Sequence, residues 1–317
     1  MKTRLFLTMA AATMILAGCS NDENEEIDNW NGEICLSSGV TVQQTRTNSD
    51  EVPDKQIAEN QEVGIFINDA TVNPPTYAVG NNLKYTADGN GGLTLSEGNA
   101  PYYPATGGNV NIWAYQPYNA GASMSDGGYD FSVKINQNNA NKDYYDSDLL
   151  YSSKTEAYNR QKEAQSLGFK HLLSKVVCIL QSGTGEPGIT GATVTIVNAE
   201  TTGTFNPSDG NFSTKTTNEG VHSDITMNSA ISFGYYIAVV PPQTFAKGDK
   251  LLKVTLEANA GGGEFYYTIP DNDLVLASGN VYTYTITVNL SGLTVTSSIS
   301  AWEGIEDNHK SGTAEME

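Results

Sequence analysis

Short runs of alternating or β-branched residues, each bounded by Gly, Pro, Asn or Asp, recur along most of this 317-residue chain. Such a pattern is typical of all-β folds built from many short strands. In Val281–Val288, aromatic and aliphatic side chains alternate with threonine, as a strand with one buried face requires. The only helical candidate is the polar segment Lys154–Ser166. The expected strands are 33–44, 62–67, 109–116, 130–135, 192–198, 233–240, 251–258, 264–269, 280–290 and 293–300.

A polar connection ending near Leu167 divides this β structure into two parts. A chain of roughly 300 residues is long enough for two domains, each with its own core. We therefore predict two tandem β-sandwich domains, residues 47–167 and 168–302. Residues 303–317 form an acidic tail with few apolar side chains, which we expect to be disordered.

The first residues have the features of an export signal. Lys2 and Arg4 precede an apolar run, Leu5–Ala17, that is shorter than the roughly 20 residues of a membrane span. We therefore interpret residues 1–18 as a signal peptide. The run ends in Leu-Ala-Gly-Cys, the pattern of a bacterial lipoprotein signal, so Cys19 is the predicted lipidation site and its acyl chains would hold the protein in a membrane. The alternative is an ordinary signal peptide with a chance cysteine. The acidic tract Ser20–Glu26 resembles a surface-export signal or is merely a solvated spacer.

Charge and cysteine content exclude several classes of protein. The chain has 17 Lys and Arg against 36 Asp and Glu, a net charge of −19, which leaves too few cations for a face that binds nucleic acid. Three cysteines cannot form a disulfide scaffold or a four-cysteine zinc site. Outside the cytoplasm Cys35 and Cys178 could pair, but Cys178 lies in an apolar run and is more simply a small buried residue.

A search for catalytic or ligand-binding motifs predicts no enzyme, no cofactor and no metal site. Gly183–Gly188 matches G-x-G-x-x-G, yet a strand follows it instead of the helix that a dinucleotide needs, so we expect a hairpin loop. The three histidines lack metal-ligand spacing, and His171 is expected to be structural, at the start of a strand. The carboxylates of Asp143–Asp148 are expected on a solvated turn. Aromatic residues near Trp113 could stack on sugars, although packing is their commoner role.

Several segments occur together in the order typical of one protein family. They are Ala100–Pro104, Val110–Tyr118, Asp148–Tyr151, Leu167–Lys175, Val239–Phe245, Ala277–Tyr284 and Ile299–Trp302. This ordered set, behind a lipoprotein signal, resembles the fimbrillin family, the pilins of surface fimbriae. The resemblance implies two transthyretin-like Greek-key sandwiches and no enzymatic activity. It also implies a location in the outer membrane and the fimbrium, and a role in adhesion to a host or bacterial surface ligand.

The resemblance also implies assembly by strand exchange with other fimbrial subunits. An Arg-specific protease would remove residues 19–46, the acidic spacer and first strand, by cutting between Arg46 and Thr47. A strand from a neighbouring subunit would then enter the open groove. The alternative is that Arg46 is a surface residue beside a permanent first strand.

The C-terminal run Leu293–Trp302 is the candidate for the donated strand, because Leu293 and Val295 alternate with threonines. It could equally be a fixed edge strand with Trp302 plugging the core. The rival function is a surface glycan-binding lipoprotein, which would need Trp113, Tyr115 and Tyr118 on an exposed face, whereas their burial would favour the pilin. Stalk, tip and accessory roles all remain open.

Overall fold

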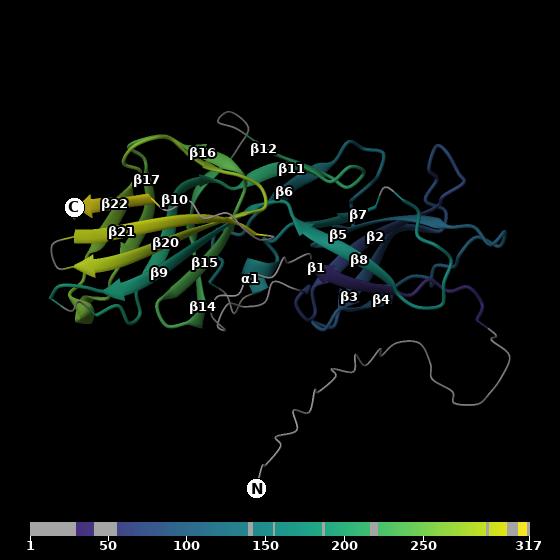
Figure 1. The fold of residues 1–317 in the computed structure, drawn as a ribbon, viewed down its shortest axis with the longest axis horizontal. Helices are drawn as coiled ribbons and strands as arrows, with labels where there is room; N and C mark the ends of the chain where they lie inside the picture. The colour runs from purple at the N-terminus through teal and green to yellow at the C-terminus, as the bar shows by residue number, and fades with distance from the viewer. Residues whose placement is uncertain are drawn as a thin grey trace, which may run out of the picture.

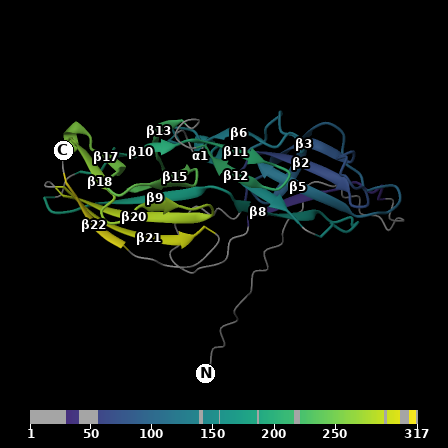
Figure 2. The same ribbon diagram turned by 90° about the horizontal axis from the view of Figure 1, so that it is seen from above.

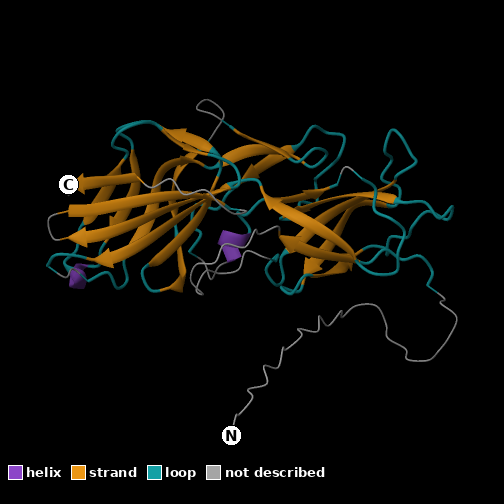
Figure 3. Ribbon diagram, viewed as in Figure 1, coloured by secondary structure: helices purple, strands orange, loops and turns teal. Residues whose placement is uncertain are grey.

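The computed structural model describes residues 30–40, 56–138, 142–154, 156–185, 188–215, 221–289, 292–302 and 310–315. The described residues form an elongated molecule with one β region at each end (Figure 1). Its only described helices are the one-turn α1 (Lys142–Tyr145) and a short 3₁₀ turn, η1 (Ala258–Ala260), and strands dominate the rest (Figure 3). The all-β prediction is therefore confirmed.

The first region is a seven-stranded closed barrel. In spatial order its strands are β1 (Leu36–Val40), β4 (Gly92–Glu97), β3 (Gly80–Ala87), β2 (Glu62–Asp69), β5 (Val110–Gln116), β7 (Leu150–Ser153) and β8 (Gln165–His171). Closure pairs β1 with β8, which are far apart in sequence, so no strand of this sheet is left at an edge. This region is thus a seven-stranded barrel, whereas we expected a β-sandwich.

The second region consists of two large sheets and two small ones. The six-stranded sheet has the order β14 (Asn228–Ser232), β15 (Tyr235–Val240), β9 (Ser174–Ser182), β20 (Asn280–Asn289), β21 (Gly292–Ala301) and β22 (Lys310–Glu315). The four-stranded sheet has the order β13 (His222–Thr226), β10 (Thr193–Glu200), β17 (Lys250–Thr255) and β18 (Glu264–Thr268). The small sheets are β12 (Asn211–Thr214), β11 (Thr202–Asn206) and β6 (Tyr129–Ser132), and β16 (Gln243–Phe245) with β19 (Leu274–Leu276).

The two large sheets lie in separate layers (Figure 2) and share one apolar core. Tyr267 of β18 and Tyr284 of β20 meet across that core with ring centroids 5.5 Å apart. Cys178 of β9 is fully buried and unbonded to Cys35, so the prediction of a small buried residue is confirmed and the disulfide is absent. Gly183 and its neighbours connect β9 to β10, which belong to different sheets, so the expected hairpin is wrong.

Strands β2, β5 and β7 supply two cores at once. Their alternate residues point into the barrel, where Ile65 is buried, or toward the second region, where Tyr115 is buried. Phe205 of β11 packs against Tyr115 with ring centroids 5.8 Å apart. A Cβ at Gly64 would lie 2.2 Å from the Tyr115 ring, so glycine is required there. Burial on both faces explains the nearly continuous apolar run of β2.

Two expectations about the connection between the regions need revision. The helix predicted for Lys154–Ser166 is wrong: no described residue of this segment is helical, and Tyr158 instead pairs with Val110 in an isolated bridge. Its polar sequence has no apolar face that a helix could bury. The expected division near Leu167 falls inside β8, so we place it after β8, before β9 begins at Ser174.

Candidate assembly site

The strand closing the barrel is the part of the structure that bears most directly on assembly. The expected strand 33–44 is present as β1, and residues 41–44 lie outside the described residues. Cys19, Arg46 and Thr47, the predicted lipidation and cleavage residues, also lie outside them.

β1 fills a seam between two strands. It runs parallel to β8, with Leu36 opposite Gln165 and Val40 opposite Phe169, and antiparallel to β4, where two residues pair. Leu36 and Val40 are buried, at 5% and 8% exposure, in the barrel core. β1 therefore provides both hydrogen-bonding partners and apolar cover to the barrel.

The residues before β1 are held by a second set of contacts. The backbone N–H of Ile34 donates to Pro101 O (2.9 Å), and that of Tyr103 donates to Gly32 O (2.8 Å). The guanidinium carbon of Arg160 lies 4.7 Å from the Trp30 ring centroid and 5.5 Å from that of Tyr103. We call this cation–π arrangement of Trp30, Tyr103 and Arg160 the aromatic clamp.

Gly32 allows the clamp to form. Its φ is +88°, a conformation that favours glycine, and a Cβ there would lie 2.9 Å from the Arg160 guanidinium nitrogens. The Tyr103 hydroxyl donates to Asn159 O (3.1 Å), which fixes the ring in the barrel wall. Tyr103 and Arg160 thus belong to the barrel body, whereas Trp30 belongs to the segment before Arg46.

Loss of residues 30–40 would leave a defined groove. β4 and β8 would each lose their partner along one side, and the core side chains under β1 would reach solvent. Unpaired edges beside an apolar face are a template for an added strand. While β1 is in place, β4 and β8 have no unpaired edge at this seam.

The candidate donor is β21, which pairs with β20 over ten residues and with β22 over six. Leu293, Val295 and Trp302 are buried. The expectation of a disordered tail is wrong for residues 310–315, because β22 is a strand and β21 is consequently not at the edge. The last two strands nevertheless form the outer side of the sheet, so they can leave together by breaking one ladder.

Trp302, directly after β21, packs against His171. The two rings stack with centroids 3.7 Å apart and an interplanar angle of 7°. His171 Nδ1 lies 2.8 Å from Asp148 Oδ1, and both residues are buried. His171 is therefore structural, but it lies at the end of β8 and not at a strand start. Asp148 is likewise buried beside α1 instead of lying on a solvated turn, because the imidazole supplies its partner.

The aromatic residues that could have formed a glycan platform do not share an exposed face. Tyr115 is fully buried at the junction between the regions, where burial raises the pKa of its hydroxyl. Trp113 is half-buried, with its ring 5.6 Å from that of Tyr77. Tyr103 is buried, and only its neighbour Tyr102 is exposed, at 45%. This burial favours the pilin interpretation over the glycan-binding one.

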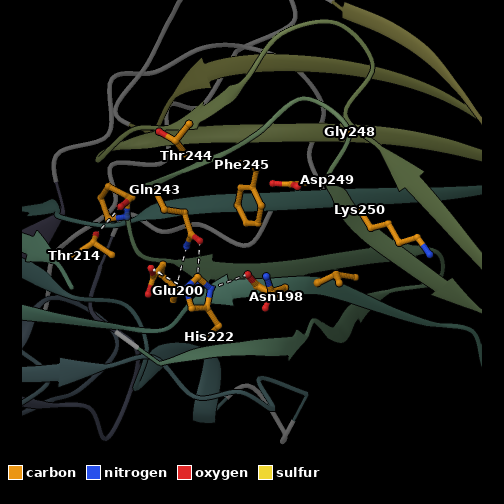
Figure 4. Close-up of a pocket in the computed structure, with 12 residues that line it drawn as sticks. Asn198, Glu200, Thr214, His222, Gln243, Thr244, Phe245, Gly248, Asp249 and Lys250 are labelled. Carbon is orange, nitrogen blue, oxygen red and sulfur yellow. Dashed lines mark hydrogen bonds and ion pairs between the residues drawn. The ribbon is translucent and has the colours of Figure 1, made fainter. Parts of the chain in front are cut away.

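A cavity of about 560 Å³ lies in the second region, between the ends of β10, β13 and β16 (Figure 4). The backbone N–H of Glu200 donates to Gln243 Oε1 (2.8 Å), and Gln243 Nε2 donates to Glu200 O (3.0 Å). His222 Nε2 lies 3.0 Å from Glu200 Oε1. The labelled aromatic residue, Phe245, is buried, so it offers no surface for a sugar ring. Gln243 joins β10 to β16, which gives this residue of the Val239–Phe245 segment a structural role.

Neither a metal centre nor a membrane span emerges from the part of the chain that the structure describes. There, no three His, Cys, Asp or Glu residues converge as metal ligands would. None of the described helices has the length and apolarity to cross a bilayer. Sequence reasoning missed the barrel closure and the aromatic clamp, because both bring together residues that lie far apart in the sequence.

Comparisons with known proteins point to one family. The model of the fimbrillin-like family matches residues 45–302. Fim1C of Bacteroides uniformis, a candidate fimbrium subunit, is 26% identical and aligns with 99% of this chain and 100% of its own length. The crystal structure of a candidate cell adhesion protein from Bacteroides uniformis (24% identity, TM-score 0.63) covers 86% of this chain and 99% of that one. Another from Bacteroides ovatus (18% identity, TM-score 0.64) covers 87% and 98%. Both solved structures share the fold.

Proposed function

Because the chain belongs to the fimbrillin-like family, whose model covers residues 45–302, we propose that it is a structural subunit of a cell-surface fimbria, assembled by β-strand exchange and serving adhesion. The observation that carries the proposal is the position of β1. This strand closes the barrel, yet it lies on the N-terminal side of the only arginine between Arg4 and Arg160. One cut after Arg46 separates the strand from the barrel that it closes.

The two ends of the chain have complementary roles in this scheme. Removal of β1 opens a groove with two edges, and β21 with β22 can leave the second region from its outer side. A groove on one subunit and a strand on the next make a heterologous contact, which propagates into a fibre instead of closing a dimer. Lipidation of Cys19 would hold the precursor at the outer membrane, and cleavage would release the subunit from that anchor.

The proposal is tested by cleavage of the purified full-length chain with an Arg-specific protease. We expect a new N-terminus at Thr47 together with filaments or SDS-resistant ladders. Arg46→Ala and the charge-conserving Arg46→Lys should abolish both products. In the Arg160→Lys variant, the only other arginine after residue 18 can no longer be cut, so the remaining products come from cleavage after Arg46.

A wild-type chain that is cleaved after Arg46 yet remains monomeric at high concentration would contradict self-polymerisation. Addition of a different subunit that then restores polymers would assign the chain an accessory or tip role. Stable filaments from Arg46→Ala would contradict cleavage-dependent assembly altogether.

A further inference from the structure

Arg160 lies at the surface of the barrel, but the segment before β1 covers part of its side chain. The guanidinium carbon is 4.7 Å from the ring centroid of Trp30 and 5.5 Å from that of Tyr103. Both terminal guanidinium nitrogens also approach Gly32, where an added Cβ would be only 2.9 Å away. Trp30 and Gly32 precede Arg46 in the sequence, so a cut after Arg46 releases them together with β1.

The peptide beside Arg160 is held through the same aromatic clamp. The Tyr103 hydroxyl donates to Asn159 O (3.1 Å). Tyr103 in turn donates its backbone N–H to Gly32 O (2.8 Å), and its ring meets that of Trp30 edge-on, with centroids 5.9 Å apart. Departure of Trp30 and Gly32 therefore frees one face of the guanidinium and also removes contacts from Tyr103, which holds the preceding peptide.

These contacts oppose the approach of a protease. An enzyme specific for arginine must take the guanidinium into its own pocket and bind the flanking backbone in an extended form. Cleavage within a folded domain then follows the population of molecules in which the segment is locally open. Because the aromatic clamp engages the guanidinium, it keeps this population low in the closed precursor.

Given the cleavage after Arg46 proposed above, we propose that the Arg160–Gln161 bond is a second processing site, which the same protease reaches only after the first strand has left. Hydrolysis adds water across this bond and leaves a carboxylate on Arg160 and an amine on Gln161. The bond lies between β7 and β8, and β8 is one wall of the groove. After the second cut the chain no longer joins β7 to β8, so the groove that the first cut opened is weakened.

The order of the two cuts is tested with Arg46→Lys, which conserves the charge and leaves Arg160 and the clamp unchanged. The purified full-length wild type and this variant are treated with a limiting amount of an Arg-specific protease, and the fragment masses are followed with time. In the wild type, we expect a new N-terminus at Thr47 first and cleavage after Arg160 only once the piece that carries Cys35 has left. In Arg46→Lys, cleavage after Arg160 should be slower by at least about tenfold.

Trp30→Ala in the Arg46→Lys background separates the effect of the clamp from that of the first cut, because the first strand stays in the chain. Loss of this cation–π contact should raise the rate of cleavage after Arg160 by about 2- to 30-fold. The matched control is Tyr102→Ala in the same background, which removes an exposed ring beside the clamp and should leave the rate unchanged. Equal rates in these two variants would show that the clamp does not protect Arg160.

Cleavage after Arg160 at the wild-type rate in Arg46→Lys would overturn the inference, because the second cut would then not depend on the first. An Arg160 that stays uncut after the piece carrying Cys35 has left would overturn it as well. Both results leave the proposed function intact, because cleavage after Arg46 and polymer formation are scored separately. A wild-type chain that is not cut after Arg46 contradicts the proposed function, together with the inference that rests on it.

Discussion

The two ends of the described chain are held in opposite ways. β1 is short and sits between two neighbours inside a closed barrel, and its departure creates two unpaired edges. β21 is ten residues long, but together with β22 it forms the outer side of an open sheet, and their departure exposes one edge. A closed sheet suits an acceptor because it is incomplete without a strand. An open sheet suits a donor because it survives the loss of its last strands.

The largest expected effect comes from a matched pair of leucines, Leu36 in β1 and Leu293 in β21, which are 5% and 3% exposed. Truncation of either to alanine should cost about 2–5 kcal/mol of unfolding free energy in its own region of the uncleaved chain. After cleavage the effects should separate: Leu36→Ala speeds loss of the first strand, whereas Leu293→Ala weakens assembly. Denaturant unfolding and sedimentation measure the two. If both variants lost the first strand at the same rate and assembled equally well after cleavage, the proposed difference between β1 and β21 would be wrong.

A smaller effect is expected where the barrel meets the end of β21. Asp148→Ala leaves the buried Nδ1 of His171, on which Trp302 stacks, without its partner, at a cost of about 1–3 kcal/mol. Urea unfolding followed by tryptophan fluorescence measures this loss. The control is Asp146→Ala, whose partner Lys142 is mostly exposed, and which should cost at most about 0.5 kcal/mol. Similar losses in both variants would count against a structural role of the His171 pair.

Trp30→Ala tests the aromatic clamp and should weaken the hold on the first strand by about 0.5–2 kcal/mol. In the cleaved protein, the half-buried thiol of Cys35 should then react faster with a thiol reagent, because the strand that carries it leaves sooner. Cys178 is an internal reference, since burial raises the pKa of its thiol and keeps it unreactive. An unchanged Cys35 labelling rate would show that the clamp does not retain the strand.

The smallest effect at neutral pH is expected from Tyr151→Phe at the junction between the two regions. Burial raises the pKa of Tyr151 to about 12, above the roughly 10 of an unfolded tyrosine. Its contribution to stability is therefore complete below pH 10 and is lost as pH rises toward 12. The variant should lose less stability than the wild type over that interval, as measured by unfolding at each pH. If the variant and the wild type lost the same stability between pH 10 and pH 12, Tyr151 would not contribute to the pH dependence of stability.

The sequence predicted the strand content, the first strand and the burial of Cys178, because alternation and apolar runs are local signals. It did not predict the barrel, since closure depends on pairing of Leu36 with Gln165, which no local pattern encodes. Asp148 was misplaced for the same reason, because its partner His171 lies on another strand. The helix expected at Lys154–Ser166 was wrong because amino-acid composition alone does not predict a helix when the segment has no periodic apolar face. The aromatic clamp could be read only once Tyr103 and Arg160 were seen together.

Under the proposed strand exchange, closure of the barrel would also determine when assembly can begin. A precursor with all barrel strands paired would offer no seam to its neighbours, however many copies were present. Competent subunits would then form only as fast as a protease cuts the precursor, so fibre growth would follow enzyme activity and not precursor abundance. A cell could accumulate such a protein on its surface in advance and convert it to filaments on demand.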